Sequence, residues 1–259
     1  MNFLYWLFSF IFGLAIGSFL NCLIWRLHIK KSILGRSVCP DCGHQIAWYD
    51  NIPLLSFIFL KGCCRYCHQK ISWQYPMVEL ATGLLFVFSF LILDSSLHIL
   101  DSIFYLSLFR HWIISAVLIF TFVYDFKYLE IEDIVLLPSA GIIFVLDLLL
   151  GYPVIKILLA VFIAVLFFLL QYWITKGKGV GLGDYRIGIF MGMALGNWSQ
   201  LAVAIFISYI VGTLVSLILL IGKKKGMKSM IPLGPFLAIG TFTALFYGRQ
   251  IINWYLQSI

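Results

Sequence analysis

The stretch VIKILLAVFIAVLFFLLQYWI, residues 154–174, decides the fold class, because Lys156 is its only charged residue. A helix rises about 1.5 Å per residue, so this run can cross a hydrocarbon core of about 30 Å. Comparable runs bring the expected total to about eight transmembrane helices, at 3–25, 77–93, 102–124, 134–150, 154–174, 185–196, 200–221 and 231–250. The run 185–196 is too short for a straight crossing, which predicts a tilted, broken or buried helix.

The composition agrees with that interpretation. Of the 259 residues, 62% are hydrophobic and 11% are charged, which leaves no room for a large soluble domain. We therefore expect an all-α integral membrane protein with one small polar segment between its first two helices. Basic residues follow the first apolar run and do not precede it, which favours a retained anchor over a cleaved signal peptide.

Lysine and arginine are distributed unevenly between the two sides of the predicted bundle. If the first run crosses from outside to inside, Arg110, Lys156 and Arg249 fall on or near the outer side. The inner side collects the rest: Arg26, Lys30, Lys31, Arg36, Lys61, Arg65, Lys70, Lys127, Lys176, Lys178, Arg186, Lys223, Lys224, Lys225 and Lys228. Cytoplasmic loops are rich in basic residues, so we expect both termini outside. The net charge of +7 then reflects topology and contact with an anionic lipid bilayer, not binding of nucleic acid.

The polar segment 27–76 holds five of the six cysteines. Two C-x-x-C pairs, Cys39 with Cys42 and Cys64 with Cys67, suit tetrahedral coordination of zinc by four thiolates. Neighbouring Cys63, His44 and His68 are alternative ligands, and of these Cys63 is interpreted as a bystander. A closed four-sulfur site is structural, so the metal should hold together a segment that is too small for its own core.

Two aspartates stand at the ends of apolar runs that the predicted topology brings to the same side. Asp125 closes the run 102–124, and Asp184 ends the sequence Gly179-Val180-Gly181-Leu182-Gly183-Asp184. Ionisable groups at the edge of a membrane are costly and therefore indicate function. The plainer interpretation of Asp184 is a helix cap beside flexible glycines. Asp133, in the loop after Asp125, is expected to be an N-cap of the next helix, with its neighbours Glu130 and Glu132 in solvent.

A pair of carboxylates is suited to hydrolysing an amide by general acid and base catalysis. Two close carboxylates cannot both ionise cheaply, so one holds a proton and polarises the carbonyl while the other activates water. Gly181 and Gly183 would support this site, because glycine allows unusual backbone angles and the close approach of an extended peptide. No Gly-x-Ser-x-Gly or His-Glu-x-x-His motif offers another hydrolytic centre.

Motifs along nearly the whole chain are similar to those of the type IV prepilin peptidases, which are leader peptidases and N-methyltransferases of the Gly-x-Gly-Asp aspartyl protease class. They are Gly17-Ser18-Phe19-Leu20-Asn21 with Arg26, Asp50-Asn51-Ile52-Pro53-Leu54-Leu55-Ser56, the two cysteine pairs, Tyr75-Pro76-Met77-Val78-Glu79, the Asp125 loop, and Gly181-Leu182-Gly183-Asp184-Tyr185-Arg186. The chain departs from the family pattern at Lys127, Tyr128 and Glu132, and it has Arg186 where lysine is common.

This resemblance implies a multi-pass protein of the bacterial cytoplasmic membrane with its active site facing the cytoplasm. It assigns catalysis to Asp125 and Asp184, and it implies type IV prepilins or pseudopilins as substrates. It also implies N-methylation with S-adenosylmethionine, for which Asn51, Pro53 and Glu79 are the candidate residues. The oligomeric state does not follow from it.

The resulting division of the chain has three parts. Residues 1–26 form the first transmembrane helix, residues 27–76 form the zinc-binding segment associated with methyl transfer, and residues 77–259 form the peptidase domain. Two other functions remain as alternatives. One is a noncatalytic membrane scaffold for pilus or secretion assembly whose zinc loop binds a partner. The other is a transporter that uses its aspartates as proton carriers, although these lie at the membrane edge and not at its midplane.

Overall fold

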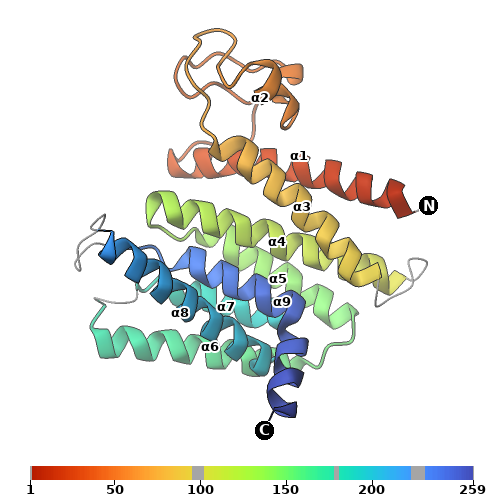
Figure 1. Ribbon diagram of the computed structural model, residues 1–259, viewed down its shortest axis with the longest axis vertical. Helices are drawn as coiled ribbons and strands as arrows, with labels where there is room; N and C mark the ends of the chain where they lie inside the picture. Colours follow the sequence, from red (N-terminus) through yellow and green to blue (C-terminus); the bar gives the residue numbers. More distant parts are fainter. Residues whose placement is uncertain (1, 95–101, 178–180, 223–230, 259) are drawn as a thin grey trace. The chain divides into compact units, whose positions relative to one another are not determined.

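The computed structural model describes residues 2–94, 102–177, 181–222 and 231–258, and within them the regular structure is helical. Figure 1 labels the elements in chain order. They are α1 (Asn2–His28), the 3-10 turn η1 (Trp48–Asn51), α2 (Leu55–Phe59), α3 (Gln74–Asp94), α4 (Ser102–Tyr128), α5 (Asp133–Leu149), α6 (Val154–Thr175), α7 (Asp184–Leu195), α8 (Trp198–Ile221) and α9 (Gly234–Gln257). Each of the eight apolar runs therefore forms a helix.

Five of these helices are long and apolar enough to cross a membrane within the described residues. They are Phe3–His28 of α1, together with α3, α4, α6 and α8. The protein is thus a multi-pass membrane protein, but eight crossings are not confirmed. Helix α5 has 17 residues and α7 has 12, both shorter than a typical crossing of about 20 residues. Five of the basic residues used for the predicted orientation, Lys178, Lys223, Lys224, Lys225 and Lys228, lie outside the described residues.

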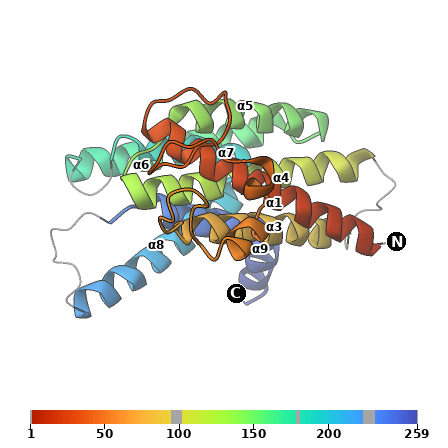
Figure 2. The same ribbon diagram turned by 90° about the horizontal axis from the view of Figure 1, so that it is seen from above.

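The chain divides into two compact units, Met1–Phe120 and Thr121–Ile259. In the first unit, α1 and α3 lie side by side in both views (Figure 1, Figure 2). Glycine makes this close approach possible, because a Cβ on Gly17 would lie 2.7 Å from the Cα of Glu79. Small residues that let backbones approach are the usual means of helix packing in membranes. Further along α3, aromatic rings form the core of this unit, with Phe86 stacked on Trp112 at 4.9 Å between ring centroids.

The second unit is built around α7, which contacts α5, α6, α8 and α9 (Figure 1). Most of its residues are buried, so the short apolar run expected at 185–196 is a helix enclosed by its neighbours. Its packing against α6 depends on Gly192, where a Cβ would lie 2.6 Å from the Cα of Val161. Helices α8 and α9 also approach closely, since a Cβ on Gly240 would collide with Ser208. This packing fixes where α7 begins, and therefore where Asp184 stands.

Candidate active site and metal centre

Asp125 lies in the last turn of α4 and is buried, with 6% of its surface exposed. Its Oδ2 accepts a hydrogen bond of 2.7 Å from the backbone N–H of Gly234, the first residue of α9. The four N-terminal N–H groups of a helix have no partner within the helix, so this N–H is available to a carboxylate. There is no room for a side chain at Gly234, because a Cβ there would lie 2.6 Å from Asp125 Oδ2.

Asp184 is the first residue of α7 and is buried to a similar degree, with 7% exposed. Its Oδ2 accepts a hydrogen bond of 2.8 Å from the N–H of Gly181. Gly183 has a φ of −67°, an angle that any residue can adopt. Glycine is needed here because there is no room for a side chain: a Cβ would lie 2.8 Å from Cδ1 of Ile131. Of the six-residue motif, Gly179 and Val180 lie outside the described residues.

Both aspartates lie in the second unit, and the loop that follows Asp125 contacts the first turn of α7, which begins at Asp184. Asp125 and Asp184, 59 positions apart in the chain, are thus two buried carboxylates of one unit, each held by one backbone N–H. Two acidic groups share a proton where their carboxylates approach each other. The chemistry open to it is general acid and base catalysis on a bound molecule.

The loop between α4 and α5 is fixed by two side-chain contacts that sequence reasoning did not predict. The Tyr124 hydroxyl donates a hydrogen bond of 2.7 Å to Glu132, so Glu132 is not simply solvated. Asp133 does not cap α5 through its side chain, because the N-cap position is Glu132. Its carboxylate instead forms an ion pair of 2.6 Å with Arg186, two residues after Asp184. This ion pair therefore holds the end of the α4–α5 loop against the first turn of α7, close to Asp184.

The four cysteines Cys39, Cys42, Cys64 and Cys67 form one cluster in the first unit, with their sulfur atoms all within 4.8 Å of one another. A tetrahedral zinc ion with bonds of about 2.3 Å places its sulfurs about 3.8 Å apart. The separation of Cys39 Sγ and Cys67 Sγ is 3.9 Å, so the cluster fits such an ion. The predicted four-cysteine group is confirmed as a possible metal site.

The two halves of the cluster have the same backbone structure. The N–H of Cys39 donates to the carbonyl of His44, and the N–H of Cys64 donates to that of Gln69. The residue after each second cysteine has a positive φ, 70° at Gly43 and 58° at His68. Backbone N–H groups point at sulfur in the second half, where those of Cys67 and Tyr66 lower the pKa of Cys64 to about 7. The second turn therefore favours the thiolate that a metal needs, whereas burial raises the pKa of Cys39 in the first.

Cys63 does not belong to the cluster. Cys63 forms an isolated β-bridge with Lys70. Val38, at the matching position of the first half, forms one with Gln45. The ring of His44 packs on Tyr66 at 3.6 Å between centroids. Cys39 is the only buried residue between Ile29 and Tyr75, so the segment has no hydrophobic core of its own.

The candidate methyl-transfer residues come together only in part. Glu79 is buried in α3, and its Oε2 accepts a hydrogen bond of 2.9 Å from the N–H of Leu54, the residue after Pro53. Asn51, which ends η1, is exposed. Glu79 therefore holds the turn that carries the other two candidates. Arg26 is a further organising residue, because its guanidinium donates to the carbonyls of Ser32, Ile33, Gly35 and Arg36.

Gly234 is the most important residue of the site that sequence reasoning missed. The available signal was the pair Gly234-Pro235 at the start of the last apolar run, since proline is common in the first turn of a helix. That signal predicts where a helix begins. It does not predict that the N–H of the glycine binds a carboxylate 109 positions earlier.

Comparison with known proteins gives two matches to family descriptions. Residues 11–93 match the Bacterial Peptidase A24 N-terminal domain, and residues 112–217 match the Type IV leader peptidase family. A protein named prepilin leader peptidase/N-methyltransferase from Aeromonas salmonicida (strain A449) is 33% identical over 99% of this chain and 95% of its own length. A protein of the same name from Bacillus subtilis (strain 168) is 33% identical over 96% of each chain.

A shorter match to a Myxococcus xanthus (strain DK1622) protein of that name is 55% identical over 84 residues, which is 32% of this chain and 25% of that protein. None of the solved structures matches this chain.

Proposed function

Since the chain belongs to the type IV leader peptidase family, we propose that it is a membrane aspartyl endopeptidase that removes the basic leader from type IV prepilins or pseudopilins. The observation that carries the proposal is the pair of buried carboxylates, Asp125 and Asp184, each oriented by a backbone N–H. Two buried carboxylates cost free energy of desolvation, so an apolar pair would serve packing better. The carboxylates supply the acid and the base that amide hydrolysis needs.

In the proposed reaction the ionised aspartate takes a proton from water, which attacks the scissile carbonyl carbon. The protonated aspartate donates its proton to the carbonyl oxygen, and the tetrahedral intermediate then collapses as the amide nitrogen is protonated and leaves. The pair titrates as a unit, so no starting proton is assigned to either residue. The N–H groups of Gly234 and Gly181 hold one oxygen of each carboxylate, which leaves the other oxygen for the reaction.

We assign the second activity, N-methylation of the new N-terminal residue, to segment 27–76, and peptide hydrolysis to residues 77–259. The support for the first assignment is the contact of Leu54 with Glu79, which attaches the Asn51–Pro53 turn to α3. S-adenosylmethionine would supply the methyl group, with Asn51, Pro53 and Glu79 as its candidate binding residues. The zinc that fits the four cysteines would hold the segment folded and take no part in the reaction.

The proposed location is the bacterial cytoplasmic membrane, with the active site facing the cytoplasm and both termini outside. The support for this orientation is the excess of lysine and arginine on one side of the bundle. In that orientation the aspartates meet a prepilin whose basic leader has stayed in the cytoplasm.

The test is mass spectrometry of a co-expressed prepilin with the wild type, Asp125→Asn or Asp184→Asn. We expect loss of the leader with the wild type only, and an added methyl mass on its product. Glu130→Gln is the matched control, because Glu130 is an exposed carboxylate five residues after Asp125 and should leave cleavage intact.

Two results would overturn the proposal. If a membrane-inserted wild type leaves several cognate prepilins uncut, the peptidase activity is wrong. Cleavage by both aspartate variants would instead mean that other residues perform the reaction. A scaffold would tolerate both aspartate changes and lose its activity with the cysteine pairs.

A further inference from the structure

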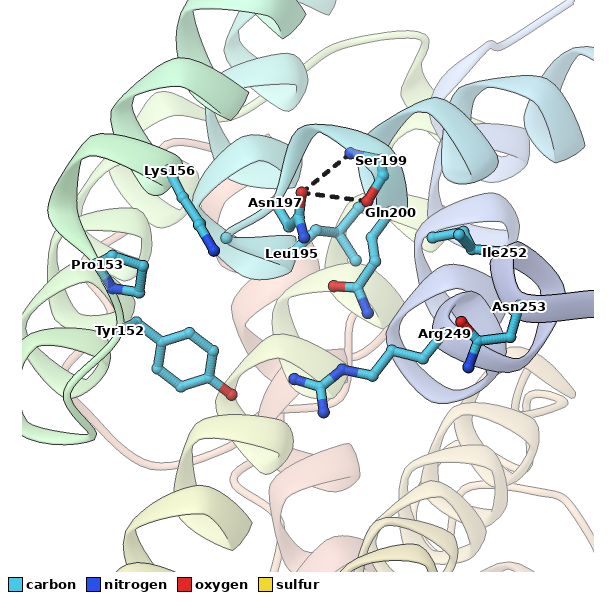
Figure 3. Close-up of a pocket in the computed structure, with 11 residues that line it drawn as sticks. Tyr152, Pro153, Lys156, Leu195, Asn197, Ser199, Gln200, Arg249, Ile252 and Asn253 are labelled. Carbon is cyan, nitrogen blue, oxygen red and sulfur yellow. Dashed lines mark hydrogen bonds between the residues drawn. The ribbon is translucent and has the colours of Figure 1, made fainter. Parts of the chain in front are cut away.

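A cavity of about 350 Å³ lies in the second unit, among the α5–α6 turn, the α7–α8 turn and α9 (Figure 3). Two of its lining residues are basic, Lys156 at the start of α6 and Arg249 in the second half of α9. Their side chains enter from different helices and point into the same space (Figure 3). Both belong to the small group of basic residues that the sequence places apart from the basic inner side.

The cavity is distinct from the pair of aspartates. It adjoins Gly196, just past the last residue of α7, whereas Asp184 is the first residue of that helix. A helix of 12 residues is about 18 Å long. Arg249 likewise follows Gly234 by 15 residues of α9, a rise of about 22 Å. Loss of charge in this cavity should therefore leave the peptidase centre unaltered.

The turns around the cavity are well defined by their sequence. Gly196 ends α7 with a φ of 62°, and Asn197 caps α8 by accepting a hydrogen bond of 3.1 Å from the N–H of Ser199. This bond uses the oxygen of the Asn197 amide and turns its nitrogen toward the cavity (Figure 3). Gln200 and Tyr152 add a second amide and a hydroxyl to the lining. Uncharged donors thus surround the two cations.

The charge of the cavity suits an anion. Among the described residues that line it none is acidic, and Lys156 and Arg249 carry two positive charges. One carboxylate lies close behind the lining, because Oδ2 of the buried Asp147 would be 4.0 Å from a Cβ on Gly196. A phosphodiester carries one negative charge, and arginine, lysine and amide groups are its usual donors.

The surroundings of the cavity are those of a membrane surface. Trp198 and Trp254 are exposed next to lining residues, and tryptophan gathers where a bilayer meets water. Exposed Ile155 and Leu158 continue the apolar face of α6 from Lys156, where an acyl chain could lie. We propose that this cavity binds a phosphate group, carried by the headgroup of an anionic phospholipid or by free phosphate.

The experiment is native mass spectrometry of the full-length protein in detergent, titrated with phosphatidylglycerol or with phosphatidylcholine of the same acyl chains. The variants are Lys156→Gln, Arg249→Gln and the double change. We expect the double variant to bind phosphatidylglycerol at least about tenfold more weakly than the wild type. Lys176→Gln is the matched control, because Lys176 is an exposed lysine beyond the other end of α6 and should leave binding unchanged.

A second arm separates the two sources of phosphate. Equilibrium dialysis with labelled inorganic phosphate is done on lipid-free protein. Binding that is lost in the double variant assigns the site to free phosphate, whereas tight binding of phosphatidylglycerol alone assigns it to lipid. Charge-conserving Lys156→Arg should retain binding in either case and shows that the fold tolerates change at this position. The proposal would be overturned if the wild type and the double variant bind phosphatidylglycerol equally well and also bind inorganic phosphate equally well.

Discussion

Replacing Gly234 by alanine tests whether the backbone N–H at the start of α9 positions Asp125. The added Cβ would lie 2.6 Å from Asp125 Oδ2 and 3.0 Å from its Cβ. A methyl carbon needs about 3.5 Å from its neighbours, so the carboxylate oxygen must move by about 0.9 Å. That movement breaks the hydrogen bond of 2.7 Å from Gly234 to Asp125.

The expected loss of activity follows from the size of the displacement. Misplacing a catalytic group by about 1 Å costs about a hundredfold in rate, and losing a preorganised donor costs about 10²–10³ in kcat. We therefore expect kcat for prepilin cleavage to fall about a hundredfold or more. KM should change much less, because the substitution alters the carboxylate and not the surface that a prepilin would bind.

The assay is the initial rate of leader removal from a purified prepilin by purified enzyme, with the melting temperature of each variant measured in parallel. Gly141→Ala is the matched control, since Gly141 lies inside α5 and a Cβ there meets nothing within 4 Å. The control replaces a glycine inside a helix, which by itself favours the helix by roughly 0.5–1 kcal/mol, whereas Gly234 is the first residue of α9. A kcat for Gly234→Ala within about threefold of that control would refute the reasoning.

Three further predictions concern packing, metal and charge. Gly192→Ala should lower the free energy of unfolding by about 1–3 kcal/mol, because its Cβ would lie 2.6 Å from the Cα of Val161; a melting temperature equal to that of Gly141→Ala would contradict this. Cys64→Ser should lose the metal found by elemental analysis while Cys63→Ser keeps it, and equal metal contents would show that the ligands are wrong. Arg65 donates two hydrogen bonds to Asp50, of 2.8 and 2.6 Å. This hydrogen bonding is the main cause that lowers the pKa of the Asp50 carboxyl. The pair therefore stabilises the folded state above the ordinary aspartate pKa of about 3.9 and loses that effect as the pH falls through the lowered value. A double-mutant cycle at neutral pH should give a favourable coupling between Asp50 and Arg65, and no coupling would contradict this.

The helices could be predicted from the sequence because apolarity over about 20 residues is a local property. The cysteine cluster was equally accessible, since each C-x-x-C turn is local and only their meeting depends on the fold. The number of membrane crossings could not be predicted from the sequence, because α7 is apolar without being exposed to lipid along its length. Its residues face other helices of the second unit, and composition alone does not distinguish that environment from lipid.

Contacts between distant residues were the other part that the sequence did not predict. Asp133 was expected to cap α5, a role that depends on its neighbours, and it pairs instead with Arg186, 53 positions later. The N–H of Gly234 escaped notice for the same reason, because a backbone group carries no residue-specific signal. The positions of Asp125 and Asp184 at the ends of apolar runs were visible, but not the groups that orient them.

Between Ile29 and Tyr75 there is almost no buried residue, which determines how this segment should unfold when the metal is removed. Without metal, the part around the cysteines has little to keep it folded beyond the contacts that Arg26 and Glu79 make with the segment, whereas α1 and α3 pack through glycine contacts that do not involve it. Removal of metal should therefore leave the helix pair intact and loosen the backbone around Lys70, whose side chain is already exposed, so that trypsin can cut there. Limited digestion would then count the metal-free molecules in a preparation, since each is cut between two helices that stay together.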